Sequence, residues 1–228
     1  MAFISFQPHD YFNTKLYTGN SNGGNSNTQS ITGVGFQPDW SWIKNYSSTA
    51  DHALFDAVRG VTKMLNSNNT EAQETVADTL TAFDSDGFTL GTDLNQGVVN
   101  NLNETFVSWN WKAGGAGSAN TDGDINSTVS VNQTAGFSIV KYTGSGSAQT
   151  VGHGLNAVPK WIIVKRLAGS GYDWVVYHTE DSAGLYLNSN GYNADSSSNN
   201  IWFNGAAPTS SVFTTGTDGR IGNAVDYI

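Results

Sequence analysis

The chain contains no cysteine and few charged residues, and both features exclude particular classes of site and partner. Without cysteine, its 228 residues cannot form disulfides, zinc–thiolate sites or a thiol nucleophile, so stability must come from apolar burial and backbone pairing. Charged residues make up 13%, and 19 acidic side chains outnumber 10 basic ones, for a formal net charge of −9. Because this balance repels polyanions, we expect no nucleic-acid partner.

Long apolar runs are missing as well. No stretch approaches the roughly 20 apolar residues that a membrane-spanning helix needs, so we expect no membrane insertion. The first residues, Met1 to Pro8, are too short and too poor in positive charge for a signal peptide.

Motifs of catalysis are absent or unconvincing. Gly19-Asn20-Ser21-Asn22-Gly23 matches the Gly-x-Ser-x-Gly string, but it lies among Asn and Gly rather than between a buried strand and a helix. The histidines are scattered without metal-ligand spacing or an evident nucleophile partner. A polysaccharide-cleaving enzyme would need two carboxylates roughly 5–9.5 Å apart, and no acidic pair lies near a dense aromatic cluster. We therefore expect no enzymatic activity.

Asn, Ser, Thr and Gly are abundant, and apolar residues often alternate with polar ones. The segment 106–111 sends Val107, Trp109 and Trp111 to one face, while 161–164 and 174–177 are nearly continuous apolar runs. Frequent Asp-Gly and Asn-Gly pairs interrupt these runs, as in sandwiches and barrels of short strands. Residues 70–80, which begin with a possible capping box, are equally compatible with a short helix and with none. The pattern predicts an all-β fold.

The sequence also repeats itself. Six strings recur in the same order: Tyr17-Thr18-Gly19 with Tyr142-Thr143-Gly144, Gly33-x-Gly35 with Gly152-x-Gly154, Pro38-x-Trp40 with Pro159-x-Trp161, Leu65-Asn66-Ser67-Asn68 with Leu187-Asn188-Ser189-Asn190, Phe88-Thr89 with Phe213-Thr214, and Val107-Ser108-Trp109 with Val225-Asp226-Tyr227. The offset runs from 118 residues (Val107 to Val225) to 125 (Tyr17 to Tyr142). Such a period is too long for a solenoid unit and suits two whole domains.

We accordingly predict two tandem β-sandwich domains, lectin-like or jelly-roll-like. Residues 1–112 would hold the N-terminal segment and the first repeat, 113–131 a Gly/Ala/Ser-rich linker, and 132–228 the second repeat. Aromatic residues at matched positions are expected to fill equivalent cores: Trp40 and Trp161, Trp109 and Tyr227, Phe88 and Phe213.

Several strings resemble a repeated, poorly characterised domain of marine tailed-phage virion proteins of the tail-fibre or decoration type. They include Ser5-Phe6-Gln7-Pro8, Phe12-Asn13-Thr14-Lys15-Leu16-Tyr17, Gly33-Val34-Gly35-Phe36-Gln37-Pro38, Leu54-Phe55-Asp56-x-x-Arg59-Gly60, Phe83-Asp84-Ser85-Asp86-Gly87-Phe88 and Trp109-x-Trp111-Lys112-Ala113-Gly114. The resemblance implies a lectin-like sandwich fold, a location on the virion, and other virion proteins as partners. It implies no established chemistry.

Five residues are candidates for ligand contact in the loop that the two repeats do not share: Tyr192, Trp202, Asn190, Asn193 and Asn204. A partly exposed Tyr or Trp can stack on the apolar face of a sugar ring, and Asn can bond to its hydroxyls. Burial of these aromatics in a core or an interface remains the alternative. We expect the whole stretch 190–208 to be exposed.

Two further groups of charged residues could serve either a binding site or the structure of a turn. Asp84 and Asp86 could contribute to a calcium site, although two carboxylates fall short of the 6–8 oxygens that calcium prefers, and an Asp-Gly turn is the commoner explanation. Asp56 and Arg59 are expected to form a structural ion pair or a turn cap. No other cofactor is expected.

The sequence thus predicts a phage virion structural protein, part of a tail fibre or a capsid decoration, that serves particle architecture or attachment to the host surface. The alternative is a pair of carbohydrate-binding modules that recognise surface glycans without catalysis. In either case we expect a homo-oligomer. A flexible linker leaves the two domains no fixed angle of their own, so neighbouring chains or a large inter-domain contact should set their arrangement.

Overall fold

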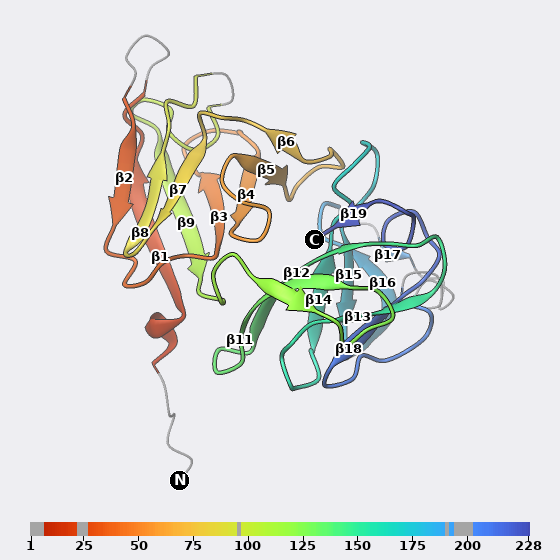
Figure 1. The fold of residues 1–228 in the computed structure, drawn as a ribbon. Coiled ribbons are helices and arrows are strands. Elements are labelled where there is room, and N and C mark those ends of the chain that lie inside the picture. Colours follow the sequence, from red (N-terminus) through yellow and green to blue (C-terminus); the bar gives the residue numbers. More distant parts are fainter. Residues whose placement is uncertain (1–6, 22–26, 95–96, 190–191, 194–202) are drawn as a thin grey trace. The chain divides into compact units, whose positions relative to one another are not determined.

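The computed structural model describes residues 7–21, 27–94, 97–189, 192–193 and 203–228 (Figure 1). The chain divides into two compact units. Unit 1 comprises Met1–Leu65 and Glu74–Ala116, and unit 2 comprises Asn66–Gln73 and Gly117–Ile228. The described residues form strands, turns and one short 3-10 helix, η1 (Pro8–Asp10). They include no helix that is long and apolar enough to cross a membrane. The predicted all-β class is confirmed.

Unit 1 contains two antiparallel sheets. The first has the strand order β1-β9-β3-β4-β5-β6 and the second has the order β2-β8-β7. The strands are β1 (Phe12–Thr18), β2 (Gln29–Thr32), β3 (Trp40–Asn45), β4 (His52–Asp56), β5 (Lys63–Asn66), β6 (Glu74–Thr75), β7 (Leu80–Asp84), β8 (Gly87–Leu90) and β9 (Thr105–Trp111).

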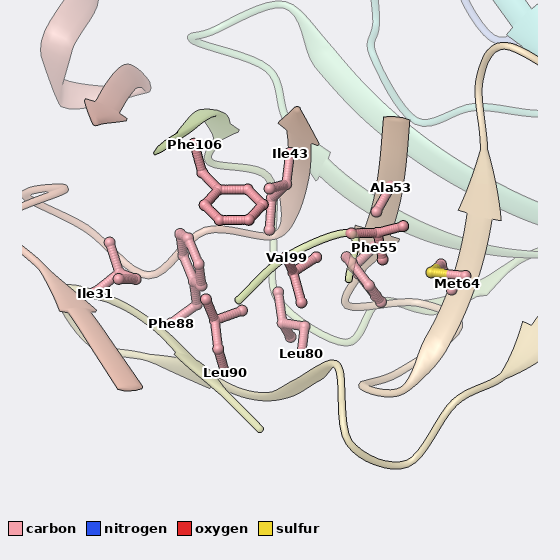
Figure 2. Packing of buried hydrophobic residues seen from close by; sticks show 11 residues of the cluster. Ile31, Ile43, Ala53, Phe55, Met64, Leu80, Phe88, Leu90, Val99 and Phe106 are labelled. Atoms are coloured by element: carbon pink, nitrogen blue, oxygen red, sulfur yellow. The ribbon is translucent and has the colours of Figure 1, made fainter. Parts of the chain in front are cut away.

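The core of unit 1 draws side chains from both sheets, as a β-sandwich does (Figure 2). Ile43, Phe55 and Phe106 come from the first sheet, and Phe88 and Leu90 from the second; all five are almost fully buried. At about 25 cal/mol per Å² of apolar surface removed from water, this packing is the main stabilising contribution available to a chain without disulfides.

The described residues of unit 2 form three sheets, ordered β10-β11-β12-β19, β13-β18 and β14-β15-β16-β17. Its core includes Tyr142, Val151, Val175, Phe213 and Tyr227. The strands are β10 (Ser118–Asn120), β11 (Ser127–Asn132), β12 (Phe137–Thr143), β13 (Gln149–Gly152), β14 (Trp161–Val164), β15 (Val175–His178), β16 (Asp181–Tyr186), β17 (Tyr192–Asn193), β18 (Val212–Thr215) and β19 (Asp226–Tyr227).

Pairings at the first repeated tyrosine correspond between the two units. Tyr17 pairs with Phe106 across β1 and β9, and the two rings stack with centroids 5.2 Å apart. Tyr142 pairs with Tyr227 across β12 and β19, and those rings stack at 5.1 Å. Each tyrosine also meets the matched phenylalanine edge-on, Phe88 at 6.3 Å in unit 1 and its counterpart in unit 2 at 5.9 Å.

The hydroxyls of the two buried tyrosines also make equivalent hydrogen bonds, each to a backbone carbonyl. The Tyr17 hydroxyl donates to the carbonyl of Val99 at 2.8 Å, and the Tyr142 hydroxyl donates to the carbonyl of Ile221 at 2.9 Å. Burial raises the pKa of both phenols well above the usual value, so both remain neutral donors. The Tyr-Thr-Gly string therefore recurs because it builds the same buried contact in each unit.

The glycine of this string is required by a close approach of two backbone segments. A Cβ on Gly19 would collide with the carbonyl oxygen of Asn101, and a Cβ on Gly144 would collide with that of Asn223. The neighbouring bonds correspond too, since Gly19 N–H donates to Glu104 O at 2.9 Å and Gly144 N–H donates to Val225 O at 3.0 Å. Any side chain here would force the loop away from the strand.

Strand β9 alternates as predicted, but its tryptophans lie on the side away from the core. Phe106, Ser108 and Asn110 are fully buried, whereas Trp109 and Trp111 are half-buried. The expectation that Trp40 and Trp109 fill the core is therefore wrong. Buried Ser and Asn are tolerated because they bond to one another, as described below.

Trp161 also departs from the prediction, since it is 57% exposed. Its counterpart in unit 1, Trp40, is half-buried and stacks on Trp111 of β9 with centroids 4.7 Å apart. The matched aromatic pair that does fill equivalent cores is Phe88 and Phe213, as predicted. Tyr227 occupies the place of Phe106, not of Trp109, because the paired registers differ by three residues from the string match.

Two connecting segments differ from their predictions. Residues 113–131, predicted as a linker, contain β10 and most of β11, and Ser118 pairs with Val129 across these strands. The stretch 70–80 forms no helix; it contains the short strand β6, which pairs Glu74 with Met64 of β5. Strand pairing with β5 outweighs the weak helical propensity of this segment.

Candidate functional site

The outer face of the larger sheet in unit 1 carries an aromatic row, Phe12, Trp40, Trp42, Trp109 and Trp111. Phe12 lies on β1, two tryptophans lie on β3 and two on β9. Adjacent rings are 4.7 to 6.2 Å apart: Phe12–Trp111 at 4.8 Å, Trp40–Trp111 at 4.7 Å, Trp40–Trp42 at 6.2 Å and Trp42–Trp109 at 6.2 Å. Strand alternation puts these rings together, because residues two apart share a face.

A buried polar layer beneath the row holds these strands in register. Ser41 Oγ donates to Asn110 Oδ1 at 2.9 Å, and Asn110 Nδ2 donates to Ser108 Oγ at 3.0 Å. All three side chains are fully buried. Because these buried polar groups bond to one another, the layer fixes one pairing of β3 with β9 rather than destabilising the sheet.

The row ends at a histidine. Trp42 Nε1 lies 3.4 Å from His52 Nδ1, on the neighbouring strand β4. Burial, followed by the charge of Lys44, lowers the pKa of His52, so the ring is neutral at neutral pH and Nδ1 can accept a hydrogen bond from the Trp42 indole N–H. An array of indole faces with a polar rim is chemically suited to stacking on sugar rings or on apolar side chains.

Strings of the form Trp-x-Trp, at Trp40–Trp42 and at Trp109–Trp111, are the sequence signal of this row. Trp42 and Trp111 have no aromatic counterpart in the second repeat. What sequence reasoning missed was the pairing of Trp42 with Trp109 and of Trp40 with Trp111 across β3 and β9.

The five residues predicted to contact a ligand are only partly within the described structure. Asn190 and Trp202 lie outside the described residues. The backbones of Tyr192 and Asn193 form β17, which pairs with β16. Asn204 is exposed in a turn and has a positive φ of 53°. The described residues therefore do not assemble these five into one site, and their role stays a prediction.

The expected exposure of the stretch 190–208 is wrong in its described part at two positions. Phe203 is 2% exposed and packs in the core of unit 2, where its ring meets Tyr177 at 5.5 Å. Pro208 is buried as well, whereas Asn204, Gly205 and Ala207 are exposed. A large apolar side chain within a Gly- and Asn-rich stretch anchored the loop instead of presenting a surface.

The two aspartates proposed for calcium hold the turn between β7 and β8. Asp86 accepts hydrogen bonds from Gly33 N–H at 2.9 Å and Gly35 N–H at 2.6 Å, and these bonds lower the pKa of its carboxyl. Asp84 accepts from the Thr89 hydroxyl at 2.7 Å. The described residues contain no group of three or more His, Cys, Asp or Glu side chains arranged for a metal.

Asp56 and Arg59 form an ion pair whose side chains are 3% and 2% exposed. The guanidinium Nε contacts Asp56 Oδ2, Nη2 donates to the carbonyl of Leu54 at 3.2 Å, and the Arg59 backbone N–H donates to Asp56 Oδ1 at 2.8 Å. The pair closes the turn after β4, the structural role that the sequence suggested.

His153 is buried. Its Nε2 lies 3.2 Å from Thr209 O, and its Nδ1 accepts from Leu155 N–H at 3.2 Å. Burial lowers the pKa of this ring, which is therefore neutral and serves the backbone of two loops.

Three cationic side chains in unit 2, those of Lys165, Arg166 and Arg220, contact carbonyl, aromatic or carboxylate groups of the same unit. Lys165 is fully buried, donates to Tyr172 O at 2.6 Å, and has a pKa lowered to about 8 by burial, which Asp173 and Glu71 oppose. The Arg166 guanidinium lies 3.9 Å above the ring of Tyr172. Arg220 pairs with Asp173 at 3.3 Å and with Asp218 at 3.2 Å.

The segment Asn66–Gln73 completes this part of unit 2. Trp174 Nε1 donates to Asn66 O at 2.9 Å, Ser170 Oγ donates to Glu71 at 2.7 Å, and Gln73 N–H donates to Leu167 O at 3.1 Å. The cationic side chains are thus part of the architecture of unit 2.

Fold and site together describe an all-β chain that carries an aromatic row on one antiparallel sheet of unit 1. The chain belongs to the family described as a domain of unknown function (DUF7483), whose model matches residues 7–228. No match was found among curated proteins or among solved structures.

Proposed function

We propose that the chain is a non-enzymatic structural protein of a tailed-phage particle, made of two tandem β-sandwich domains and acting in particle architecture or host-surface attachment. The observation that carries this proposal is the buried Tyr-Phe-aromatic contact that recurs in both units. An all-β framework in which the same buried contact recurs suits a load-bearing or adhesive protein. The resemblance of its strings to virion proteins supports a location on the particle.

Fractionation of particles tests this function. An antibody against the purified chain should detect it in particles banded by density gradient, at a fixed copy number relative to a major capsid protein. Other virion proteins should retain it in pull-down from dissociated particles. A chain that appears only in the particle-free fraction would refute the proposal.

A second candidate function, glycan binding without catalysis, is favoured by the aromatic row. Its stacked indoles offer apolar faces, with His52 at one end of the row. A glycan array should then give saturable binding that Trp109→Ala or Trp42→Ala weakens. Tyr46→Ala is the matched control, because Tyr46 is 55% exposed in unit 1 but is not part of the row. Equal loss in all three variants, or no glycan bound, would exclude this function.

A further inference from the structure

Strand β1 forms one edge of the larger sheet of unit 1, and among the described strands it pairs with β9 alone. At one end of this pairing, Lys112 N–H donates to Tyr11 O at 2.8 Å. At the other end, Gly19 N–H donates to Glu104 O at 2.9 Å. Bonded and non-bonded pairs alternate in an antiparallel ladder, so the odd-numbered residues of β1 bond to β9. The N–H and C=O groups that point away from β9 are those of the even-numbered residues, Phe12, Thr14, Leu16 and Thr18.

Side chains already satisfy two of these outward groups. Asn13 Oδ1 accepts a hydrogen bond from Thr14 N–H at 2.9 Å, and Gln29 Nε2 donates to Thr18 O at 3.0 Å. In the described part of the chain no hydrogen bond reaches Thr14 O, Thr18 N–H or either backbone group of Leu16. An edge that is capped in this way is closed to most strands, but it stays open to a strand whose own open groups match.

A second copy of β1 offers that match in one antiparallel register. The capped Thr14 N–H needs no acceptor and the capped Thr18 O needs no donor, so these two groups should lie opposite each other. Leu16 then lies opposite Leu16 of the second copy. Each Leu16 N–H can donate to the other Leu16 O, and each Thr18 N–H can donate to Thr14 O of the other copy. A shift by two residues in either direction would put an open group opposite a capped one.

The side chains agree with this register. At 67% exposure, Leu16 is the most exposed of the large apolar side chains in the part of the chain that the structure describes. Two such side chains would meet across the strands and remove apolar surface from water. A Thr14–Thr18 pair would flank them on each side, and cross-strand Thr pairs stabilise sheets. Lys15 would lie opposite Tyr17 of the second copy, so like charges would not face each other directly.

We propose that two copies of this chain associate through β1, about a two-fold axis that passes between their Leu16 residues. The larger sheets of the two copies thereby join into one continuous antiparallel sheet. Because the axis is perpendicular to the sheet, the outer faces of both copies lie on the same side. The aromatic rows of the two copies therefore belong to one face. The proposal concerns self-association and does not depend on the proposed function.

The interface is small, which determines how it is measured. One pair of strands buries less surface than the standard protein interface of about 1,600 Å², so the dimer should dissociate on dilution. Sedimentation equilibrium over a range of protein concentrations should show a mass that rises from one copy toward two.

Leu16→Lys should abolish this rise, because it places two ammonium groups opposite each other across the axis. Leu102→Lys is the matched control: Leu102 is 38% exposed in unit 1 and lies outside β1, so this variant should associate as the unaltered chain does. In dilute solution, where the copies are separate, Leu16→Lys should leave the urea midpoint unchanged because Leu16 is exposed in the single chain. That measurement separates loss of association from loss of folding.

Disulfide trapping tests the register. The chain has no native cysteine, so a disulfide of the single-cysteine variant L16C can only join two copies. Bonded antiparallel pairs have Cα atoms about 5.5 Å apart, which lies within the range that a disulfide spans. L16C should therefore link readily under mild oxidation. T14C is the control on the same edge, because its two copies would be offset by roughly 13 Å along the strands. Mixing T14C with T18C should give the mixed dimer.

Three results would overturn the proposal. One is a chain that stays monomeric at every concentration. Another is T14C linking as well as L16C, because the two Leu16 residues would then not lie opposite each other. The third is self-association that Leu16→Lys leaves intact, since a different surface would then hold the copies together.

Discussion

Removal of Phe88 or Phe213 tests whether the two units rest on the same buried contact. Each ring is almost fully buried, at 0% and 4% exposure, and each meets the stacked tyrosine of its unit edge-on. Truncation of a buried Phe to Ala removes its transfer free energy and leaves a cavity, which together cost about 3–5 kcal/mol. We expect Phe88→Ala and Phe213→Ala to destabilise by similar amounts.

That cost is a large fraction of the stability of an ordinary domain, about 5–15 kcal/mol, so the effect should be plain in urea unfolding. Circular dichroism and tryptophan fluorescence would follow the transitions of the two units, and the denaturant midpoint should fall at an unchanged slope. Leu16→Ala is the control, because Leu16 is 67% exposed and its truncation should change stability by less than about 0.5 kcal/mol.

The reasoning fails if one phenylalanine can be truncated at little cost while the other cannot. In that case the matched strings would mark similar sequences without equivalent cores. It also fails if Leu16→Ala is as costly as either substitution, because burial would then not be what distinguishes these positions.

Short-range patterns were predictable from the sequence. Period-two alternation gave the strands, and the recurring Tyr-Thr-Gly string marked a contact that both units build. Which side of a strand faces the core was not predictable from hydrophobicity. In β9 the tryptophans lie outward, and Ser108 and Asn110 lie inward, because mutual hydrogen bonds satisfy the buried polar atoms.

Long-range placement was beyond sequence reasoning. Nothing local in Asn66–Gln73 indicates that it bonds to Trp174 and Leu167, residues that are far away in the chain. The aromatic row likewise depends on β3 lying beside β9, which brings two Trp-x-Trp strings into one array. Each Trp-x-Trp string was visible alone, and only the sheet order joins them.

Three further substitutions probe particular contacts. Arg59→Met should cost about 3–5 kcal/mol in urea unfolding because it leaves the Asp56 carboxylate buried without its partner, and Asp56→Asn in the same chain should recover part of that loss. Gly19→Ala should lower the melting temperature, since its Cβ would meet the carbonyl oxygen of Asn101, and a normal melting curve would contradict the close approach. Lys165 has a folded pKa of about 8, below its usual 10.5, so the unfolded chain binds more protons between these values and stability due to this group should rise with pH there. Lys165→Met should flatten that rise in urea titrations from pH 7 to 10, and an unchanged slope would show that the amine is not desolvated in the folded chain.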